Sequence, residues 1–218
     1  MGNSDTHGFT SIESGCPRNW VQSDTDDPAF LDEAAVARAV KEGRVVASFG
    51  PFIRFFAGEE QFGPGSDVQA LGGRVELNIE VQAPRWFNID RVELYENGEL
   101  IQEWTGDSIN NDDVLRFLET VEVNPSKDSW YAVVALGADD LSPLYTPVEF
   151  PPIQLEDVVT SALAGVGLDS FLSAPVPFPR YFPVRPYAVT NPIWVDADGD
   201  GSFTPPGIPT WMKAQVAD

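Results

Sequence analysis

The sequence predicts a mostly β protein whose core is an immunoglobulin-like antiparallel β-sandwich. Residues 74–82 alternate polar and apolar side chains without a break, which is the period-two pattern of a strand with one face in a core and one in water. Apolar residues at 91–95 and 100–101 flank Asn97 and Gly98. This pair predicts a β-hairpin, because both central residues of a type I′ turn need positive φ. Short strands at this spacing are typical of such sandwiches.

Two further segments complete the predicted sandwich. Residues 115–123 have strand periodicity with four apolar residues on one face, namely Leu115, Phe117, Val121 and Val123. Residues 130–136 form a continuous apolar run, as expected for a strand that is buried on both sides. A turn-rich joint at 63–66 precedes these strands, so we expect the sandwich to span residues 66–150.

A helix is predicted at residues 32–42, ahead of the sandwich. Acidic residues lie at its start and Lys41 lies near its end, which suits the helix dipole. Its apolar stripe consists of Ala35, Val36, Ala39 and Val40. Gly43 ends the helix, and residues 44–49 have the pattern of a buried strand. A helix followed by a buried strand is half of an α/β unit. Such a unit needs parallel neighbouring strands, and no other segment of the sequence predicts them.

The charge of the chain is strongly negative. Its 218 residues, enough for one large domain or two small ones, include 34 acidic and 13 basic side chains, which gives a formal net charge of −21. Nucleic acid and anionic membrane surfaces would be repelled, since binding them requires Lys and Arg. Cations are natural partners. The alternative is that the acidic residues only keep the protein soluble. Because the chain has only 3 Lys, this alternative includes adaptation to high salt.

Cysteine content and hydropathy restrict the class of protein further. Cys16 is alone, so an internal disulfide framework is excluded. No apolar stretch reaches the ~18 residues of a membrane span. The first residues are polar and predict no signal peptide.

An Asp-x-His motif lies near the N-terminus. On an extended segment, Asp5 and His7 project to the same side, and a carboxylate and an imidazole so placed can reach one metal ion or two adjacent ions. His7 is the only histidine of the chain. The alternative interpretation is a frayed polar terminus.

Two motifs together carry a family resemblance. Residues 2–8 read Gly-Asn-Ser-Asp-Thr-His-Gly and residues 15–20 read Gly-Cys-Pro-Arg-Asn-Trp; a helix and Gly-Arg-Val-Val-Ala-Ser-Phe-Gly-Pro-Phe follow. This stretch, about residues 2–58, resembles the end of a PHP-type metallohydrolase of the CehA/McbA-like branch, with a weaker similarity beyond it. The resemblance implies a distorted α/β barrel with a multinuclear metal centre of zinc, manganese or iron. Asp5 and His7 would be ligands, and Arg18 would face the phosphate or ester of a small-molecule substrate.

The chain also departs from that family. The resembled enzymes open with a His-x-His motif and add further His and Glu ligands, which a chain with one histidine cannot contain. It therefore looks like the C-terminal portion, with residues 1–58 as a barrel remnant. Its implied partner is the missing N-terminal barrel segment or another chain. It would supply the last ligands for ester or phosphoester hydrolysis and be inactive alone. The alternative is a non-catalytic, calcium-stabilised accessory or binding module.

The tail, residues 151–218, is rich in proline and carries an acidic loop. Asp196, Asp198 and Asp200 are followed by Gly201, which is the D-x-D-x-D-G start of a calcium loop. The bidentate Glu expected at loop position 12 is replaced by Gly207, so affinity should be weak unless a carboxylate enters from outside the loop. The alternative is an acidic surface turn that binds no ion. Calcium at this loop would favour an extracytoplasmic location.

Two other features could bind a ligand. Residues 105–113 form an acidic segment that binds a cation or is simply solvated. Four aromatic residues could form a stacking surface, although aromatic side chains of a sandwich more often lie in the core: Trp86, Phe87, Trp104 and Trp130.

Overall fold

The computed structural model describes residues 2, 4, 16–59, 62–141, 148–149, 181–182 and 184–216. The chain divides into two compact units, one formed by residues 1–139 and 185–218 and the other by residues 140–184. In the second unit, β10 (Val148–Glu149) pairs antiparallel with β11 (Tyr181–Phe182). All elements described below belong to the first unit, which is mostly β as predicted.

The smaller sheet of this unit has three antiparallel strands. β5 (Val75–Gln82) lies in the middle, with β3 (Phe52–Ala57) on one side and β8 (Leu115–Val123) on the other. The alternation predicted for β5 is confirmed. Its inward side chains are at most 6% exposed and are those of Val75, Leu77, Ile79 and Val81.

The larger sheet is built around β9 (Ser129–Leu136). β6 (Arg91–Glu96) pairs antiparallel with one edge of β9, and β7 (Glu99–Thr105) pairs with β6. Two short strands, β12 (Tyr187–Thr190) and β13 (Ile193–Asp196), pair in succession with the other edge of β9. Strands from residues 187–196 therefore belong to the same sheet as the strands from residues 91–136.

The N-terminal part of the chain extends the same sheet. β2 (Val45–Ser48) pairs with β12 and also with β1 (Arg18–Val21), and both pairings are antiparallel. β4 (Asp67–Gln69) pairs parallel to β13. Among the described residues, the strand after the predicted helix thus has no parallel neighbour, and it continues the larger sheet instead of forming an α/β unit.

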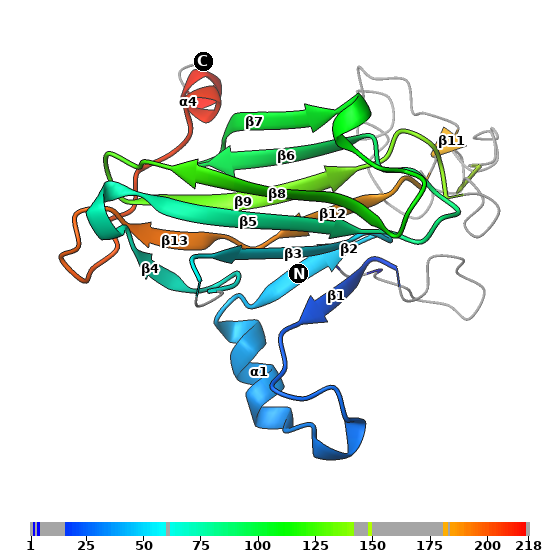
Figure 1. The fold of residues 1–218 in the computed structure, drawn as a ribbon, viewed down its shortest axis with the longest axis horizontal. Coiled ribbons are helices and arrows are strands. Elements are labelled where there is room, and N and C mark those ends of the chain that lie inside the picture. Colours follow the sequence, from blue (N-terminus) through cyan, green and yellow to red (C-terminus); the bar gives the residue numbers. More distant parts are fainter. Residues whose placement is uncertain are drawn as a thin grey trace, which may run out of the picture. The chain divides into compact units, whose positions relative to one another are not determined.

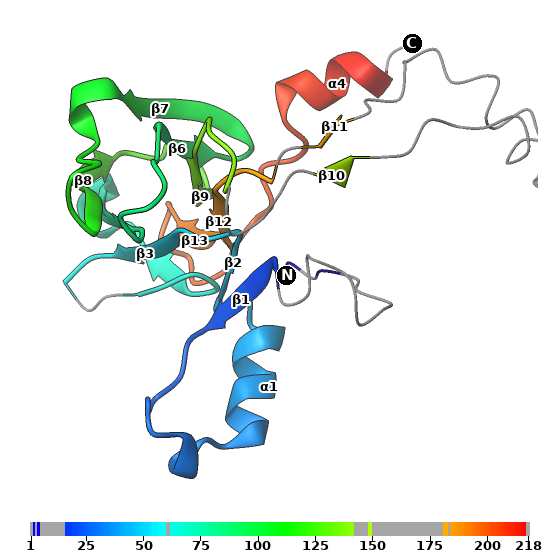
Figure 2. The same ribbon diagram turned by 90° about the vertical axis from the view of Figure 1, so that its right-hand side faces the viewer.

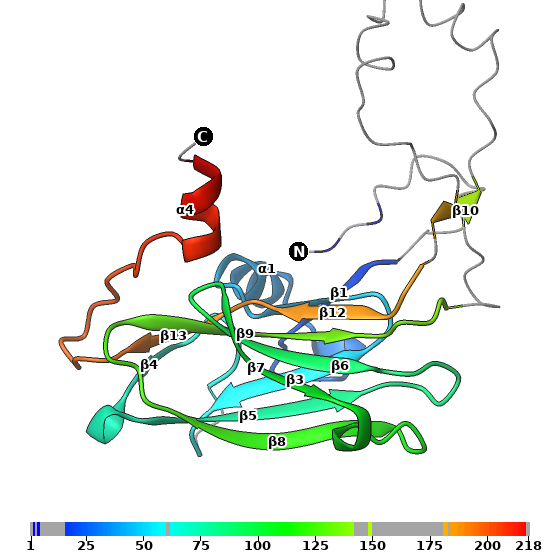
Figure 3. The same ribbon diagram turned by 90° about the horizontal axis from the view of Figure 1, so that it is seen from above.

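The two sheets form two layers with the apolar core between them (Figures 1, 2 and 3). β3 of the smaller sheet contacts β9 and β12 of the larger one. Both layers contribute side chains with 0% exposure, including Leu77, Ile79, Val81, Val92, Leu94, Val133, Ala135, Ile193 and Val195.

The predicted hairpin and the predicted face of β8 have different outcomes. Asn97 and Gly98 have φ values of +53° and +82°, and they join paired strands, so the hairpin is confirmed. In β8, the pairing with β5 shifts near Arg116, which is buried while Leu115 is exposed. The prediction that Leu115 shares a face with Phe117 was wrong, because this bulge inserts one residue between them.

In the part of the chain that the structure describes, two α-helices flank the sheets. α1 (Glu33–Lys41) lies beside β1, its first turn is capped by the Asp32 carboxylate, and Gly43 follows it with a φ of +80° (Figure 1). α4 (Thr210–Val216) lies near the end of the chain. The described residues also include short 3-10 helices at Pro28–Phe30, Leu71–Gly73 and Gly106–Ser108. No helix in the described ranges has the length and apolar character needed to cross a membrane.

Candidate metal site

Three carboxylate side chains meet at one end of the larger sheet. Asp196 is the last residue of β13, Asp128 immediately precedes β9, and Asp198 comes two residues after Asp196. β13 and β9 are antiparallel with Val195 opposite Ser129, so Asp196 and Asp128 come next in that register. One carboxylate oxygen from each of the three aspartates lies within 4.8 Å of the other two.

The loop after β13 curls around Asp196. The Asp196 carboxylate accepts hydrogen bonds from the backbone N–H groups of Gly199 (2.7 Å) and Gly201 (2.8 Å). Both glycines have positive φ, +72° and +83°, which other residues rarely adopt. Asp198 accepts a hydrogen bond from the backbone N–H of Asp200 at 3.1 Å. The turn expected of the D-x-D-x-D-G sequence is therefore formed.

Asp128 joins this loop from outside. Its Oδ1 accepts a hydrogen bond from the backbone N–H of Ala197 (2.9 Å), and its Oδ2 accepts one from that of Thr204 (2.6 Å). Asp128 is thus a carboxylate from outside the loop, of the kind needed to compensate for the absence of Glu at loop position 12. No local sequence pattern points to Asp128, because only the pairing of β9 with β13 brings it to the loop.

The cluster carries concentrated negative charge. Asp128 and Asp196 are each 6% exposed, whereas Asp198 is exposed. Burial raises the pKa of Asp196, but the N–H groups of Gly201 and Gly199 and hydrogen bonds with Asp198 and Gln69 outweigh it and lower the pKa overall. No ion pair between described residues involves the cluster. The three aspartates could therefore bind a metal ion, which would relieve their mutual repulsion.

The other predicted site residues lie elsewhere. Asp200 is exposed and accepts a hydrogen bond from Ser202 N at 2.7 Å, and it does not belong to the group of three converging oxygens. Arg18 is exposed at the start of β1. Asp5 and His7 lie outside the described residues.

The four aromatic residues named above do not form one surface. Phe87 is buried, with Trp86 packed edge-on against it at 4.8 Å between ring centroids. Trp104 packs against Phe117 at 5.0 Å. Trp130 instead lines a groove next to the carboxylate cluster.

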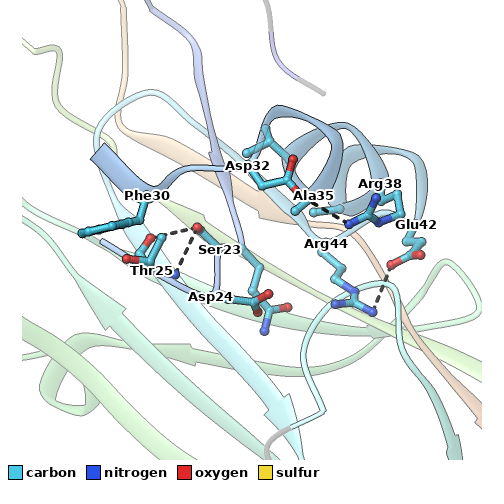
Figure 4. Close-up of a pocket in the computed structure, with 12 residues that line it drawn as sticks. Ser23, Asp24, Thr25, Phe30, Asp32, Ala35, Arg38, Glu42 and Arg44 are labelled. Atoms are coloured by element: carbon cyan, nitrogen blue, oxygen red, sulfur yellow. Dashed lines mark hydrogen bonds and ion pairs between the residues drawn. The ribbon is translucent and has the colours of Figure 1, made fainter. Parts of the chain in front are cut away.

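A cavity of about 310 Å³ lies between α1 and the segment that follows β1 (Figure 4). Its basic side chains are already paired, Arg38 with Asp32 at 3.8 Å and Arg44 with Glu42 at 2.9 Å. The cavity therefore offers no uncompensated positive charge to a ligand, and the carboxylate cluster is the stronger candidate site.

Comparison with known proteins adds no assignment. No family model matches the chain, and comparisons with curated proteins and with solved structures likewise found no match.

Proposed function

We propose that this chain is a non-catalytic, calcium-stabilised β-module that serves as an accessory or binding domain. The observation that carries the proposal is the convergence of Asp128 with Asp196 and Asp198. Carboxylate oxygens are hard ligands of the kind calcium prefers, and backbone carbonyls and water complete its flexible shell. Zinc favours nitrogen and sulfur ligands, which the cluster lacks.

The strand pairing supports the immunoglobulin-like part of this proposal. β3, β5 and β8 share one sheet, while β6, β9 and the β12–β13 pair share the other. This is the division of strands A, B and E from strands C, F and G in immunoglobulin-like sandwiches. Calcium would then connect the adjoining ends of β9 and β13, which correspond to strands F and G, to the loop that follows β13.

The test is a calcium titration followed by calorimetry. We expect a Kd of ~10⁻⁴–10⁻³ M, typical of extracellular calcium modules. About 10 mM calcium would then raise the free energy of unfolding by about 1.4–2.7 kcal/mol. The melting temperature would rise by roughly 3–10 °C. Magnesium at equal ionic strength should have a smaller effect.

Matched variants make this test specific. Asp128→Asn and Asp198→Asn should abolish the calcium response, whereas Asp107→Asn removes an equal charge from an exposed helix outside the cluster and should leave it intact. A response that survives in Asp128→Asn, or that magnesium reproduces in full, would contradict the proposal.

A second candidate is that the chain supplies the last ligands of a PHP-type metallohydrolase. One observation favours it: Asn19 and Gly2 exchange two hydrogen bonds of 2.8 Å, one from Gly2 N to Asn19 Oδ1 and one from Asn19 Nδ2 to Gly2 O. A Cβ at Gly2 would lie 3.1 Å from Pro17 Cβ and 3.2 Å from Ala47 Cβ, so glycine suits this close approach. The two motifs of the family resemblance are thus joined.

Elemental mass spectrometry tests this second candidate. The purified chain is dialysed against micromolar zinc and manganese together with about 10 mM calcium, which fills a site of the expected Kd, and its metal content above that of the buffer is measured. Retention of zinc or manganese that is lost in His7→Ala supports a hydrolase-type site. Retention of calcium alone, lost in Asp198→Asn and kept in His7→Ala, favours the β-module and contradicts the hydrolase candidate for this chain.

A further inference from the structure

An aromatic groove lies on the outer face of the larger sheet, next to the carboxylate cluster. Trp194 of β13 lies opposite Trp130 of β9 on one side and opposite Asp67 of β4 on the other. The adjacent residues of β13, Ile193 and Val195, are fully buried, so Trp194 faces away from the core. The groove has a volume of about 510 Å³.

Two rings form a corner in this groove. Phe203, from the loop after β13, packs against Trp194 with 5.0 Å between ring centroids and an interplanar angle of 72°. A pyranose ring stacks best on a flat aromatic platform, whereas a corner suits a compact, rounded group that contacts two ring faces or edges at once.

The walls of the groove are fixed by hydrogen bonds. Trp130 N donates to the side chain of Asn97 and Asn97 N donates to Trp130 O, both at 2.9 Å. Thr204, the residue after Phe203, is held by Asp128. The groove is therefore largely pre-formed, which lowers the entropy cost of binding.

The groove favours a cation. Asp67 is exposed and forms no ion pair with another described residue, and no Lys or Arg lines the groove. Indole faces carry the negative lobe of the ring quadrupole and attract cations, tryptophan most strongly. The net charge of −21 adds long-range attraction for positive ligands.

We propose that the groove formed by Asp67, Trp130, Trp194 and Phe203 binds a small organic cation of the quaternary ammonium class. The methyl groups of such a cation spread its charge over a rounded, apolar surface, which fits aromatic walls. Asp67 supplies the counter-charge at the rim. The site is separate from the carboxylate cluster, and the proposal does not depend on calcium binding there.

Choline and its neutral isostere 3,3-dimethylbutan-1-ol provide the test, since the two have nearly the same shape and differ in charge. Binding to the full chain is measured by calorimetry and by quenching of tryptophan fluorescence. We expect choline to bind about tenfold more tightly than the isostere, and Trp194→Ala or Asp67→Asn to weaken choline binding by a similar factor. Trp86→Ala, which removes an exposed tryptophan outside the groove, should have no effect.

Three outcomes would overturn the proposal. Equal binding of choline and the isostere would make the groove merely apolar. Binding of a neutral sugar in preference to choline, lost in Trp194→Ala, would make it a carbohydrate site. Failure of choline to bind at all would remove the site. If Trp194→Ala does not fold, Asp67→Asn still decides, because an exposed carboxylate without an ion pair can be replaced with little effect on folding.

Discussion

Asp128 holds both ends of the loop that follows β13. It is buried, and its two carboxylate oxygens accept hydrogen bonds from Ala197 N and Thr204 N. The same carboxylate lies beside Asp196 and Asp198. A structural role and the proposed metal-binding role would therefore fall on one side chain, and an experiment can separate them.

We expect Asp128→Ala to lower the free energy of unfolding by about 2–4 kcal/mol even in the presence of EDTA, because two backbone N–H groups lose their acceptor. In addition, calcium should no longer stabilise the variant. Urea denaturation with EDTA and with calcium measures both effects. Asp198→Asn, at an exposed position, is the control that should lose only the calcium-dependent part. Wild-type stability of Asp128→Ala in EDTA would show that its hydrogen bonds do not hold the loop.

Arg116 is a buried cation in the bulge of β8, with 1% of its surface exposed. Its guanidinium donates to the carbonyls of Pro84 (2.7 Å) and Phe87 (3.1 Å) and to that of Asn111. Burial lowers its pKa, and the nearby charge of Arg85 lowers it further. The side chain thus joins the end of the 105–113 segment to the loop after β5.

Arg116→Lys should lower the free energy of unfolding by about 2–3 kcal/mol, because an ammonium group cannot reach carbonyls on both sides as the planar guanidinium does. Arg85→Lys is the matched control. Arg85 and Asp113 form an exposed ion pair at 3.3 Å, so this change should cost at most about 0.5 kcal/mol. Chemical denaturation of both variants measures the difference. Equal stability of the two variants would contradict this expectation, because it would mean that water satisfies the carbonyls to which Arg116 donates.

At the scale of elements, local patterns were predictable and long-range pairing was not. The alternation of β5, the Asn97–Gly98 turn and the stop of α1 before Gly43 depend on neighbouring residues, and the sequence predicted all three. The pairing of β2 with β12 joins residues far apart in the chain. Periodicity along one segment contains no information on such partners, so neither this pairing nor the approach of Asp128 to the loop could be predicted.

The start of α4 is held beside β7 by hydrogen bonds, two of which go to one carboxylate. Glu99 accepts hydrogen bonds from the hydroxyl and from the backbone N–H of Thr210, and the Trp211 indole N–H donates to Gly98 O at 3.0 Å. The hydrogen bond from the Thr210 side chain lowers the pKa of Glu99 most, followed by that from the Thr210 backbone. A carboxylate with a lowered pKa stabilises the folded state above its unfolded pKa, and this stabilisation is lost as the pH falls through the folded value.

We therefore expect α4 to detach as the pH falls below the ordinary glutamate pKa of about 4.3. The fluorescence of Trp211 and the NMR signal of its indole N–H report the detachment. Glu99→Gln should loosen α4 at neutral pH and remove the acid transition. Glu103→Gln, on the same strand without a bond to α4, should keep the transition unchanged. An acid transition that persists in Glu99→Gln would assign it to another group.

At the scale of the first unit, the carboxylate cluster and the aromatic groove share one loop. Phe203 forms a wall of the groove, and the next residue, Thr204, is bound to Asp128 of the cluster. Two effects of calcium on the groove oppose each other. Calcium would order the loop and hold Phe203 in place, but its charge would repel an organic cation.

Magnitudes favour the ordering effect. Trp194 of the groove and Asp196 of the cluster are two residues apart along β13, which places their side chains roughly 7 Å apart. At that distance in water, with physiological salt, the repulsion between a divalent ion in the cluster and a monovalent cation in the groove is roughly 0.5–1 kcal/mol. Coupling through an ordered segment is typically about 1–3 kcal/mol. Calcium should therefore strengthen choline binding by a few-fold, and linkage requires that choline strengthen calcium binding by the same factor.

Calorimetric titrations in both orders, at matched ionic strength, test this coupling. Asp198→Asn should keep the choline affinity of the calcium-free chain and should lose the increase with calcium, since it removes a proposed calcium ligand but no wall of the groove. Equal factors in the two orders, both above one, would establish that the loop transmits the coupling. Weaker choline binding in calcium would mean that the loop is already ordered without the ion, so that only the repulsion between the two cations remains.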